Sequence, residues 1–202
     1  MNQPLGKYAG NALEVYECIK IMRNEADEAA ASTRDLSVEL AARMLVLAGA
    51  STAIDDARKT VETKLQNGNA LEIFKQNIEL QNGDPRVCDD PESLLDKRVV
   101  ECAIQANSTG IVTEIDTFKI GNALIDLGGG RIKAEDSVDP AVGFCSQVRI
   151  GSAIKNGETL GIAFCRTNEQ ADKVREKLRN AFTVANDVPV VKPKLIHAVI
   201  GE

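Results

Sequence analysis

Apolar residues recur every three to four positions through the first half of the chain, a spacing that predicts amphipathic helices. The first helix is expected to be capped by Asn11. Its apolar stripe consists of Leu13, Val15, Tyr16, Ile19 and Met22. Ser32 and Asp35 have the spacing of a capping box ahead of a second helix, which Gly49 is expected to end.

Two further helices are expected at 53–66 and 69–81, each with a polar start and a glycine after its end, Gly68 and Gly83. The turn-rich sequence GDPRVCDDPE follows, and beyond it apolar residues alternate with polar ones. Because this change from a helical to a strand period marks a change of architecture, we predict a mainly helical domain over 1–97 and a second domain over 98–202.

The second half is predicted to mix strands with two helices, which makes the fold class α+β. Strands are expected at 99–106, 110–116, 142–150 and 159–165, and helices at 118–127 and 168–182, the latter capped by Thr167 or Asn168. The pair Asn156-Gly157 predicts a hairpin turn with positive φ at both residues. A closing strand over 188–200 contains Pro189 and Pro193, which favour an edge position.

Composition excludes several classes of partner. The 202 residues carry a net charge of −6, only 3% are aromatic, and none is Trp. An acidic chain with few aromatic rings is a poor match for nucleic acid or an anionic membrane. No apolar run approaches the roughly 18 residues of a spanning helix, and the N-terminus does not resemble a secretory signal. We therefore expect a cytoplasmic protein.

The five cysteines include no Cys-x-x-Cys pair, so we expect reduced and mostly buried thiols rather than zinc ligands or a disulfide framework. The one histidine, His197, has no acid or cysteine at ligand spacing, and we interpret it as a packed or rim residue. No serine lies in a Gly-x-Ser-x-Gly elbow. The loop Gly128–Arg131 is interpreted as a helix stop, with a phosphate cradle as the alternative.

Several motifs occur in an order that resembles one enzyme family. They are MNQPLG, GNALEV, the LAG of 47–49, GDPRV, GIVTEID, LGGGR, KAEDSVDPAVG and GSAIKNGETL. The series, which covers residues 1 to about 164, resembles the C-terminal half of the pyrimidine nucleoside phosphorylases, thymidine phosphorylase in particular. The resemblance implies the end of the catalytic domain, followed by an α/β-hammerhead domain related to barrel-sandwich hybrids.

The family reaction is the phosphorolysis of a pyrimidine nucleoside to the free base and (deoxy)ribose 1-phosphate. The family's phosphate loop, Lys-His-Ser-Thr-Gly-Gly, does not occur in the sequence, and neither do its base-binding motifs. We therefore expect no catalytic residue in this chain and no phosphorolysis by the chain alone. The substrates, phosphate and a pyrimidine nucleoside, belong to the complete enzyme, and we expect self-association or a complementing N-terminal chain.

The resemblance also implies part of a cation site. In bacterial relatives a structural monovalent cation is held by two carbonyls of the QPLG loop near the start of this sequence and by a glutamate of the helix that follows. These ligands correspond to Leu5, Tyr8 and Glu17. We expect a partial K⁺ site with these ligands and no required cofactor. From the residues alone, the favoured interpretation of Glu17 is a solvated side chain.

Two alternatives to an enzyme half remain. A truncated paralogue would act as a non-enzymatic interaction or ligand-binding module. A carrier domain would carry a modification on Lys155, because GSAIKNGETL has the spacing found in lipoyl and biotinyl domains, although the Met or Asp that usually neighbours the modified lysine is missing.

Overall fold

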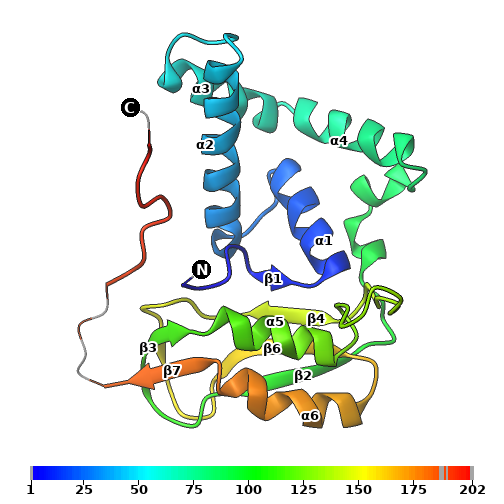
Figure 1. Ribbon diagram of the computed structural model, residues 1–202, viewed down its shortest axis with the longest axis vertical. Helices are drawn as coiled ribbons and strands as arrows, with labels where there is room; N and C mark the ends of the chain where they lie inside the picture. The colour runs from blue at the N-terminus through cyan, green and yellow to red at the C-terminus, as the bar shows by residue number, and fades with distance from the viewer. Residues whose placement is uncertain (1, 187–188, 190, 201–202) are drawn as a thin grey trace. The chain divides into compact units, whose positions relative to one another are not determined.

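The structure is a computed structural model that describes residues 2–186, 189 and 191–200. The chain divides into two compact units. The sheet unit comprises Met1–Val15 and Leu94–Lys194, and the helical unit comprises Tyr16–Ser93 and Leu195–Glu202. Helices and strands are mixed along the chain, consistent with the predicted α+β class (Figure 1). None of the described helices is long and apolar enough to cross a membrane.

The helical unit follows the predicted helices closely. Its elements are the end of α1 (Asn11–Met22), η1 (Glu28–Ala30), α2 (Ala31–Leu47), α3 (Ile54–Gln66), α4 (Asn69–Leu80), η2 (Pro85–Cys88) and most of η3 (Pro91–Leu94). Gly49 and Gly68 follow α2 and α3 with positive φ, as the sequence predicted. After α4 the left-handed residue is Asn82 rather than Gly83, because asparagine also tolerates this conformation.

The predicted caps of the first two helices are wrong. Asn11 is the first helical residue, and its side-chain amide donates to the carbonyl of Gly129 at 3.1 Å. The Ala30 cap of α2 has no side-chain hydrogen bond, and the 3₁₀ turn before it is capped by Asp27. That turn moves the start of the ordered helical segment four residues ahead of Ser32, so the Ser32 and Asp35 pattern lies inside the helix.

The helical unit buries few large side chains. α4 contains no buried residue, and the buried residues of α2 are Val38, Glu39 and Ala42. Large apolar side chains are instead exposed on α2 and α4, namely Leu40, Met44, Leu47, Ile73 and Leu80. Leu47 and Leu80 are 87% and 84% exposed. These positions form apolar faces that none of the described residues of this unit covers.

The sheet unit contains two small antiparallel sheets. The first has the order β1-β4-β6-β2 and the second β5-β3-β7. The strands are β1 (Tyr8–Ala9), β2 (Val100–Gln105), β3 (Gly110–Ile115), β4 (Gly143–Ser146), β5 (Ala153–Ile154), β6 (Thr159–Cys165) and β7 (Phe182–Ala185). β1 pairs with β4, so the N-terminal residues complete one edge of the first sheet.

Two helices, α5 (Thr117–Asp126) and α6 (Asn168–Arg179), lie side by side on the sheet unit (Figure 1). Helix α6 packs its buried residues Ala171, Val174 and Leu178 toward β2 and β6, and the three- and four-residue spacing places them on one face. Helix α5 contacts α6 and β4. One continuous core of buried residues, from Cys102 to Phe182, results.

Two predictions for the second half are wrong. The Asn156-Gly157 turn joins β5 to β6, which belong to different sheets, so it is not a hairpin. Only Gly157 has a positive φ, and Glu158 N–H closes the turn on the carbonyl of Lys155. The two strands that the prediction joined, at 142–150 and 159–165, do pair, because β4 is antiparallel to β6, but β5 lies between them in the sequence.

The predicted closing strand is also wrong for the residues that the structure describes. Positions 189 and 191–200 form no strand, while positions 188 and 190 of that prediction lie outside the described residues. The last strand is β7, at Phe182–Ala185, where the prediction had the helix end. Two prolines remove backbone donors from the segment after β7, which opposes strand pairing there.

Candidate functional site

The loop of residues 3–7 contains Leu5, one of the three predicted cation ligands. The carbonyls of Pro4, Leu5 and Gly6 all accept hydrogen bonds from the guanidinium of Arg149. Its Nη1 donates to the oxygens of Pro4 and Gly6 at 2.8 and 2.9 Å, and its Nη2 donates to the oxygen of Leu5 at 2.7 Å. A protein side chain therefore already brings a positive charge to these three oxygens.

The other two predicted ligands lie on β1 and α1. Tyr8 pairs with Cys145, and Ser146 N–H donates to the carbonyl of Lys7 at 2.8 Å. Because alternate carbonyls of an antiparallel strand point to opposite sides, the carbonyl of Tyr8 is directed away from β4. Glu17 belongs to the helical unit and is only 5% exposed, so the alternative of a solvated Glu17 is wrong.

A metal ion fits poorly at the carbonyl of Leu5. An ion bound there would share its oxygen with a guanidinium nitrogen 2.7 Å away, and the two positive charges would repel each other. Over the described part of the chain, no group of three or more His, Cys, Asp or Glu residues is suited to hold a metal ion. Cation binding by Leu5, Tyr8 and Glu17 stays a prediction.

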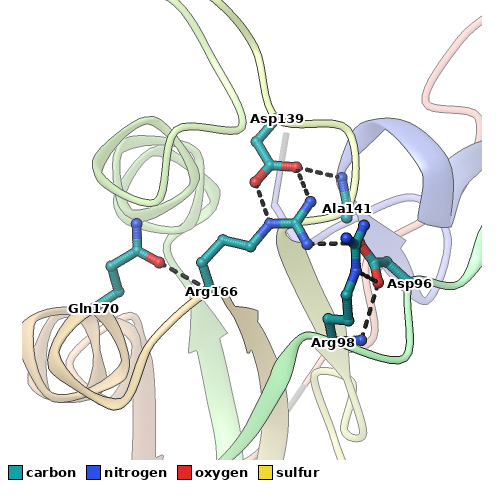
Figure 2. Close-up of polar contacts among 6 residues, drawn as sticks. All are labelled: Asp96, Arg98, Asp139, Ala141, Arg166 and Gln170. Carbon is teal, nitrogen blue, oxygen red and sulfur yellow. Dashed lines mark hydrogen bonds and ion pairs between the residues drawn. The ribbon is translucent and has the colours of Figure 1, made fainter.

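The densest charged cluster of the sheet unit centres on Arg166, directly after β6 (Figure 2). Arg166 Nε and Nη2 donate to the two carboxylate oxygens of Asp139 at 2.5 and 2.7 Å, and Nη1 donates to Asp96 at 2.6 Å. Arg98 donates to both oxygens of Asp96 at 2.9 Å. The cluster thus alternates two guanidiniums with two carboxylates.

These contacts lower the pKa values of the two carboxyl groups in the cluster and raise the pKa of Arg166. Hydrogen bonds from Arg98, and then from Arg166, hold the pKa of Asp96 well below its ordinary value of 3.8. The Arg166 guanidinium, helped by Ala141 N–H, also lowers the pKa of Asp139. The pKa of Arg166 is raised by the same two carboxylates, Asp139 first. All four side chains are therefore charged at neutral pH, and their charges cancel.

The Arg166 cluster is a structural tie rather than an anion site. The bonds made by Arg166 direct Nε and both terminal nitrogens toward carboxylates, which compete with any phosphate. The cluster connects the segment before β2, the loop before β4 and the end of β6 through Asp96, Asp139 and Arg166. Sequence reasoning missed it because its members lie 27 and 70 residues from Arg166, and no local pattern marks such pairs.

The glycine loop after α5 ends that helix, as the sequence interpretation favoured. Gly128 has a φ of +88°, and its N–H donates to Ile125, while Gly129 N–H donates to Leu124. These are the two hydrogen bonds of a Schellman helix end. Farther along, the N–H groups of Ile132 and Lys133 donate to Asp136. Because these donors are used within the loop, the phosphate-cradle alternative is not supported.

The remaining candidates show no catalytic constellation among the described residues. His197 is exposed in a segment without helix or strand, so the expected apolar strand around it is wrong. Lys155 is exposed at the start of the 155–158 turn, where its N–H donates to Glu158 at 2.8 Å. The carrier alternative for Lys155 stays a prediction.

The expectation that the thiols are mostly buried is confirmed. All five cysteines are free, and only Cys18 is exposed. Burial raises the pKa of Cys165 to about 11 and also raises the pKa of Cys88. Thiols with raised pKa values are poor nucleophiles at neutral pH, so these two cysteines are packing residues.

Comparisons with known proteins find similarity to a single family of enzymes. The family model of the pyrimidine nucleoside phosphorylase C-terminal domain matches residues 111–185, from β3 to β7. A pyrimidine-nucleoside phosphorylase of Bacillus subtilis (strain 168) is 37% identical over 202 residues, which is 100% of this chain and 45% of that relative. Relatives of the same name from Staphylococcus aureus (strain USA300) and Geobacillus stearothermophilus are 36% identical over the same shares.

This chain corresponds to the C-terminal half of the pyrimidine nucleoside phosphorylases. The resemblance predicted from the sequence is thereby confirmed at the level of this family. The match extends over the helical unit as well as the sheet unit, because it covers the whole chain. The chain spans about half the length of the curated relatives that it matches, 45% in each of these three cases.

Proposed function

We propose that this chain forms the C-terminal half of a thymidine phosphorylase-like enzyme. In the proposed reaction, phosphate displaces the pyrimidine base from C1′ of a nucleoside and yields the (deoxy)ribose 1-phosphate. The observation that carries the proposal is the 37% identity to a pyrimidine-nucleoside phosphorylase over the full 202 residues. We propose further that residues 98–202 form an α/β-hammerhead domain, an assignment that the two small sheets and the helices α5 and α6 support.

The proposed role of the chain is to frame the reaction rather than to perform it. Phosphorolysis needs an anchored phosphate and donors that stabilise the leaving base. The sequence contains no Lys-His-Ser-Thr-Gly-Gly loop. Among the described residues, Arg149 and Arg166 direct their guanidiniums to carbonyls and carboxylates of this same chain. Both observations support the proposal that the catalytic groups come from a part of the enzyme outside these 202 residues.

The proposed partner of the helical unit is the portion of a phosphorylase that this chain does not match. The exposed apolar positions of α2 and α4 support this choice, because helix faces with residues such as Leu47 on α2 and Leu80 on α4, each more than four-fifths exposed, favour burial against another protein surface. All five thiols are free, which supports a reducing cytoplasmic location.

The test is a complementation assay for release of the base. The chain is assayed alone and after co-expression with the unmatched portion of the Bacillus subtilis relative, using thymidine or uridine and phosphate, with free base measured by chromatography. We expect no release above the blank for the chain alone and phosphate-dependent release for the pair. Turnover by the chain alone contradicts the framing role, and an inactive but stably associated pair contradicts the enzyme assignment.

A matched pair of variants tests the docking face in the same assay. Met44→Glu places a charge on the exposed apolar face of α2, and Lys64→Glu places one on the exposed surface of α3. We expect Met44→Glu to reduce co-purification of the two halves at least about tenfold, because a desolvated, unpaired charge opposes docking. Lys64→Glu should co-purify like the unaltered chain. Equal co-purification of both variants contradicts this face as the docking surface.

A further inference from the structure

The loop of residues 3–7 is fastened along its length to residues 146–150. Besides the Arg149 contacts, the side-chain oxygen of Gln3 accepts a hydrogen bond from Ile150 N–H at 3.0 Å. Ser146 N–H donates to the carbonyl of Lys7 at 2.8 Å. The loop therefore has a neutral hydrogen bond at each end and a cationic side chain at its middle.

Arg149 is itself held in place by a tight turn. Its N–H donates to Ser152 Oγ at 3.0 Å, and its carbonyl accepts from Ser152 N–H at 2.9 Å. Gly151, within this turn, has a φ of +94° and donates its N–H to the carbonyl of Val112 at 2.8 Å. Because the backbone of Arg149 is fixed, its guanidinium is aimed at the loop from a defined point.

Three consecutive carbonyls directed at the same guanidinium repel each other unless a positive charge lies between them. A guanidinium is suited to this position because it is planar, always charged and carries five N–H donors. We propose that the Arg149 guanidinium is the resident cation of the loop 3–7 and takes the place of a metal ion at the carbonyl of Leu5. This inference concerns the loop alone and goes beyond the proposed enzymatic function.

The proposal has two consequences that a monovalent metal ion at Leu5 would not have. The unaltered chain needs no particular alkali cation to order the loop. The positive charge that faces the three carbonyls belongs to Arg149, a residue of the same chain. Without Arg149, the three carbonyls form an oxygen-rich cradle of the kind that hard cations prefer. A variant that lacks Arg149 should therefore become sensitive to K⁺.

Tyrosine fluorescence provides a local readout for the experiment. The chain has two tyrosines and no tryptophan, and Tyr8 lies next to the loop in β1. In a Tyr16→Phe background, Tyr8 is the one tyrosine, and its emission reports thermal unfolding near the loop. The variants are Arg149→Met, Arg149→Lys and, as control, Arg131→Met, which removes an exposed arginine. Each is measured in choline chloride and in KCl at the same ionic strength of about 0.1 M.

We expect the midpoint of the parent to differ by less than about 1 °C between choline and K⁺. Arg149→Met should unfold at least about 4 °C lower in choline, and K⁺ or about 10 mM methylguanidinium should restore half of this loss or more. The midpoint of Arg149→Lys in choline should lie between those of the parent and of Arg149→Met, because an ammonium carries a charge but cannot span three oxygens. Arg131→Met should behave like the parent.

Three results would overturn the proposal. The first is a K⁺-specific stabilisation of the parent as large as that of Arg149→Met. The second is an Arg149→Met variant that responds to neither K⁺ nor methylguanidinium. The third, which remains decisive when Arg149→Met yields no folded protein, is an Arg149→Lys midpoint in choline equal to that of the parent.

Discussion

Gly161 lies where β6 passes against the aromatic ring of Phe144 on β4. A methyl group added at Gly161 would lie 2.2 Å from Cζ of Phe144 and 2.7 Å from the carbonyl oxygen of Cys145. Both contacts are far shorter than van der Waals distance, and Phe144 is almost fully buried. The ring of Phe144 can therefore occupy its position only because residue 161 on the neighbouring strand is a glycine.

We expect Gly161→Ala to lower the free energy of unfolding by about 1–3 kcal/mol, because the added methyl group overpacks a filled core. Urea denaturation followed by circular dichroism measures the effect. Phe144→Leu shortens the side chain that the methyl group meets. In the double variant, the combined loss should be smaller than the sum of the two single losses by at least about 0.5 kcal/mol. Strict additivity would show that the two positions do not contact each other.

The control at this scale is Gly121→Ala, on the exposed side of α5. An added Cβ at Gly121 has no neighbour within 4 Å. Because alanine favours helices more than glycine does, this variant should be more stable by roughly 0.5–1 kcal/mol. The same chemical change thus has opposite signs at two positions, and the surroundings of each glycine decide which.

At the scale of elements, the Arg166 cluster ties three segments of the sheet unit together, and it makes their attachment depend on pH. The pKa values of Asp96 and Asp139 are lowered in the folded state by hydrogen bonds from arginines. A carboxyl group with a lowered folded pKa stabilises the fold at pH values above its unfolded pKa. That stabilisation is lost as the pH falls from about 4 toward the lowered folded values.

We therefore expect the parent to lose more stability between about pH 5 and pH 3 than Arg166→Met does. In that variant Asp139 loses its guanidinium partner, so its pKa returns toward the ordinary value and less stabilisation remains to be lost. Thermal midpoints at the two pH values measure the difference, with Arg131→Met as the surface control. An Arg166→Met variant with the same pH dependence as the parent would contradict a role for these ion pairs.

Elements defined by local rules were predictable, while those defined by distant contacts were not. The helix ends at Gly49, Gly68 and Gly128 follow from the conformational freedom of glycine, and Thr167 caps α6 through a hydrogen bond from Gln170 N–H. The pairing of β1 with β4 joins segments more than 130 residues apart, and no periodicity encodes it. The Asn156-Gly157 dipeptide correctly predicted a turn ahead of β6, but nothing local indicated that the short strand β5 before it pairs in the other sheet.

The resemblance named candidate cation ligands, but it did not indicate how the carbonyl of Leu5 is hydrogen-bonded. The resemblance pointed to Leu5, Tyr8 and Glu17. Nothing near Leu5 in the sequence indicated that Arg149 would donate a hydrogen bond to its carbonyl. The two residues come together because β1 pairs beside the turn that carries Arg149, at a separation of 144 residues. A side chain that acts on backbone oxygens also leaves no motif, because carbonyls are common to every residue.

At the scale of the whole molecule, the two units differ in how well their cores are filled. The sheet unit has a continuous core that includes β6, whereas α4 in the helical unit buries no residue. Local stability follows the burial of apolar contacts, so the two units should differ in hydrogen exchange.

We expect the amides of α4 in the isolated chain to exchange at least about tenfold faster than those of β6, measured by hydrogen-exchange mass spectrometry. Peptides over Asn69–Leu80 and Thr159–Cys165 provide the comparison. Binding of the complementing half should slow exchange in α4 while that in β6 changes little. Equal protection of both peptides in the isolated chain would contradict the difference between the two cores.

The two-residue strand β1 has a consequence for how the sheet is assembled. Its partner β4 acquires that neighbour only after a loop of more than a hundred residues has closed, which makes this pairing a late and entropically costly step in folding. Until it forms, β4 presents an unpaired row of backbone groups that can template pairing with another molecule. We therefore expect residues 8–9 to limit intermolecular pairing at β4, although they are remote in sequence from the strand that they cover.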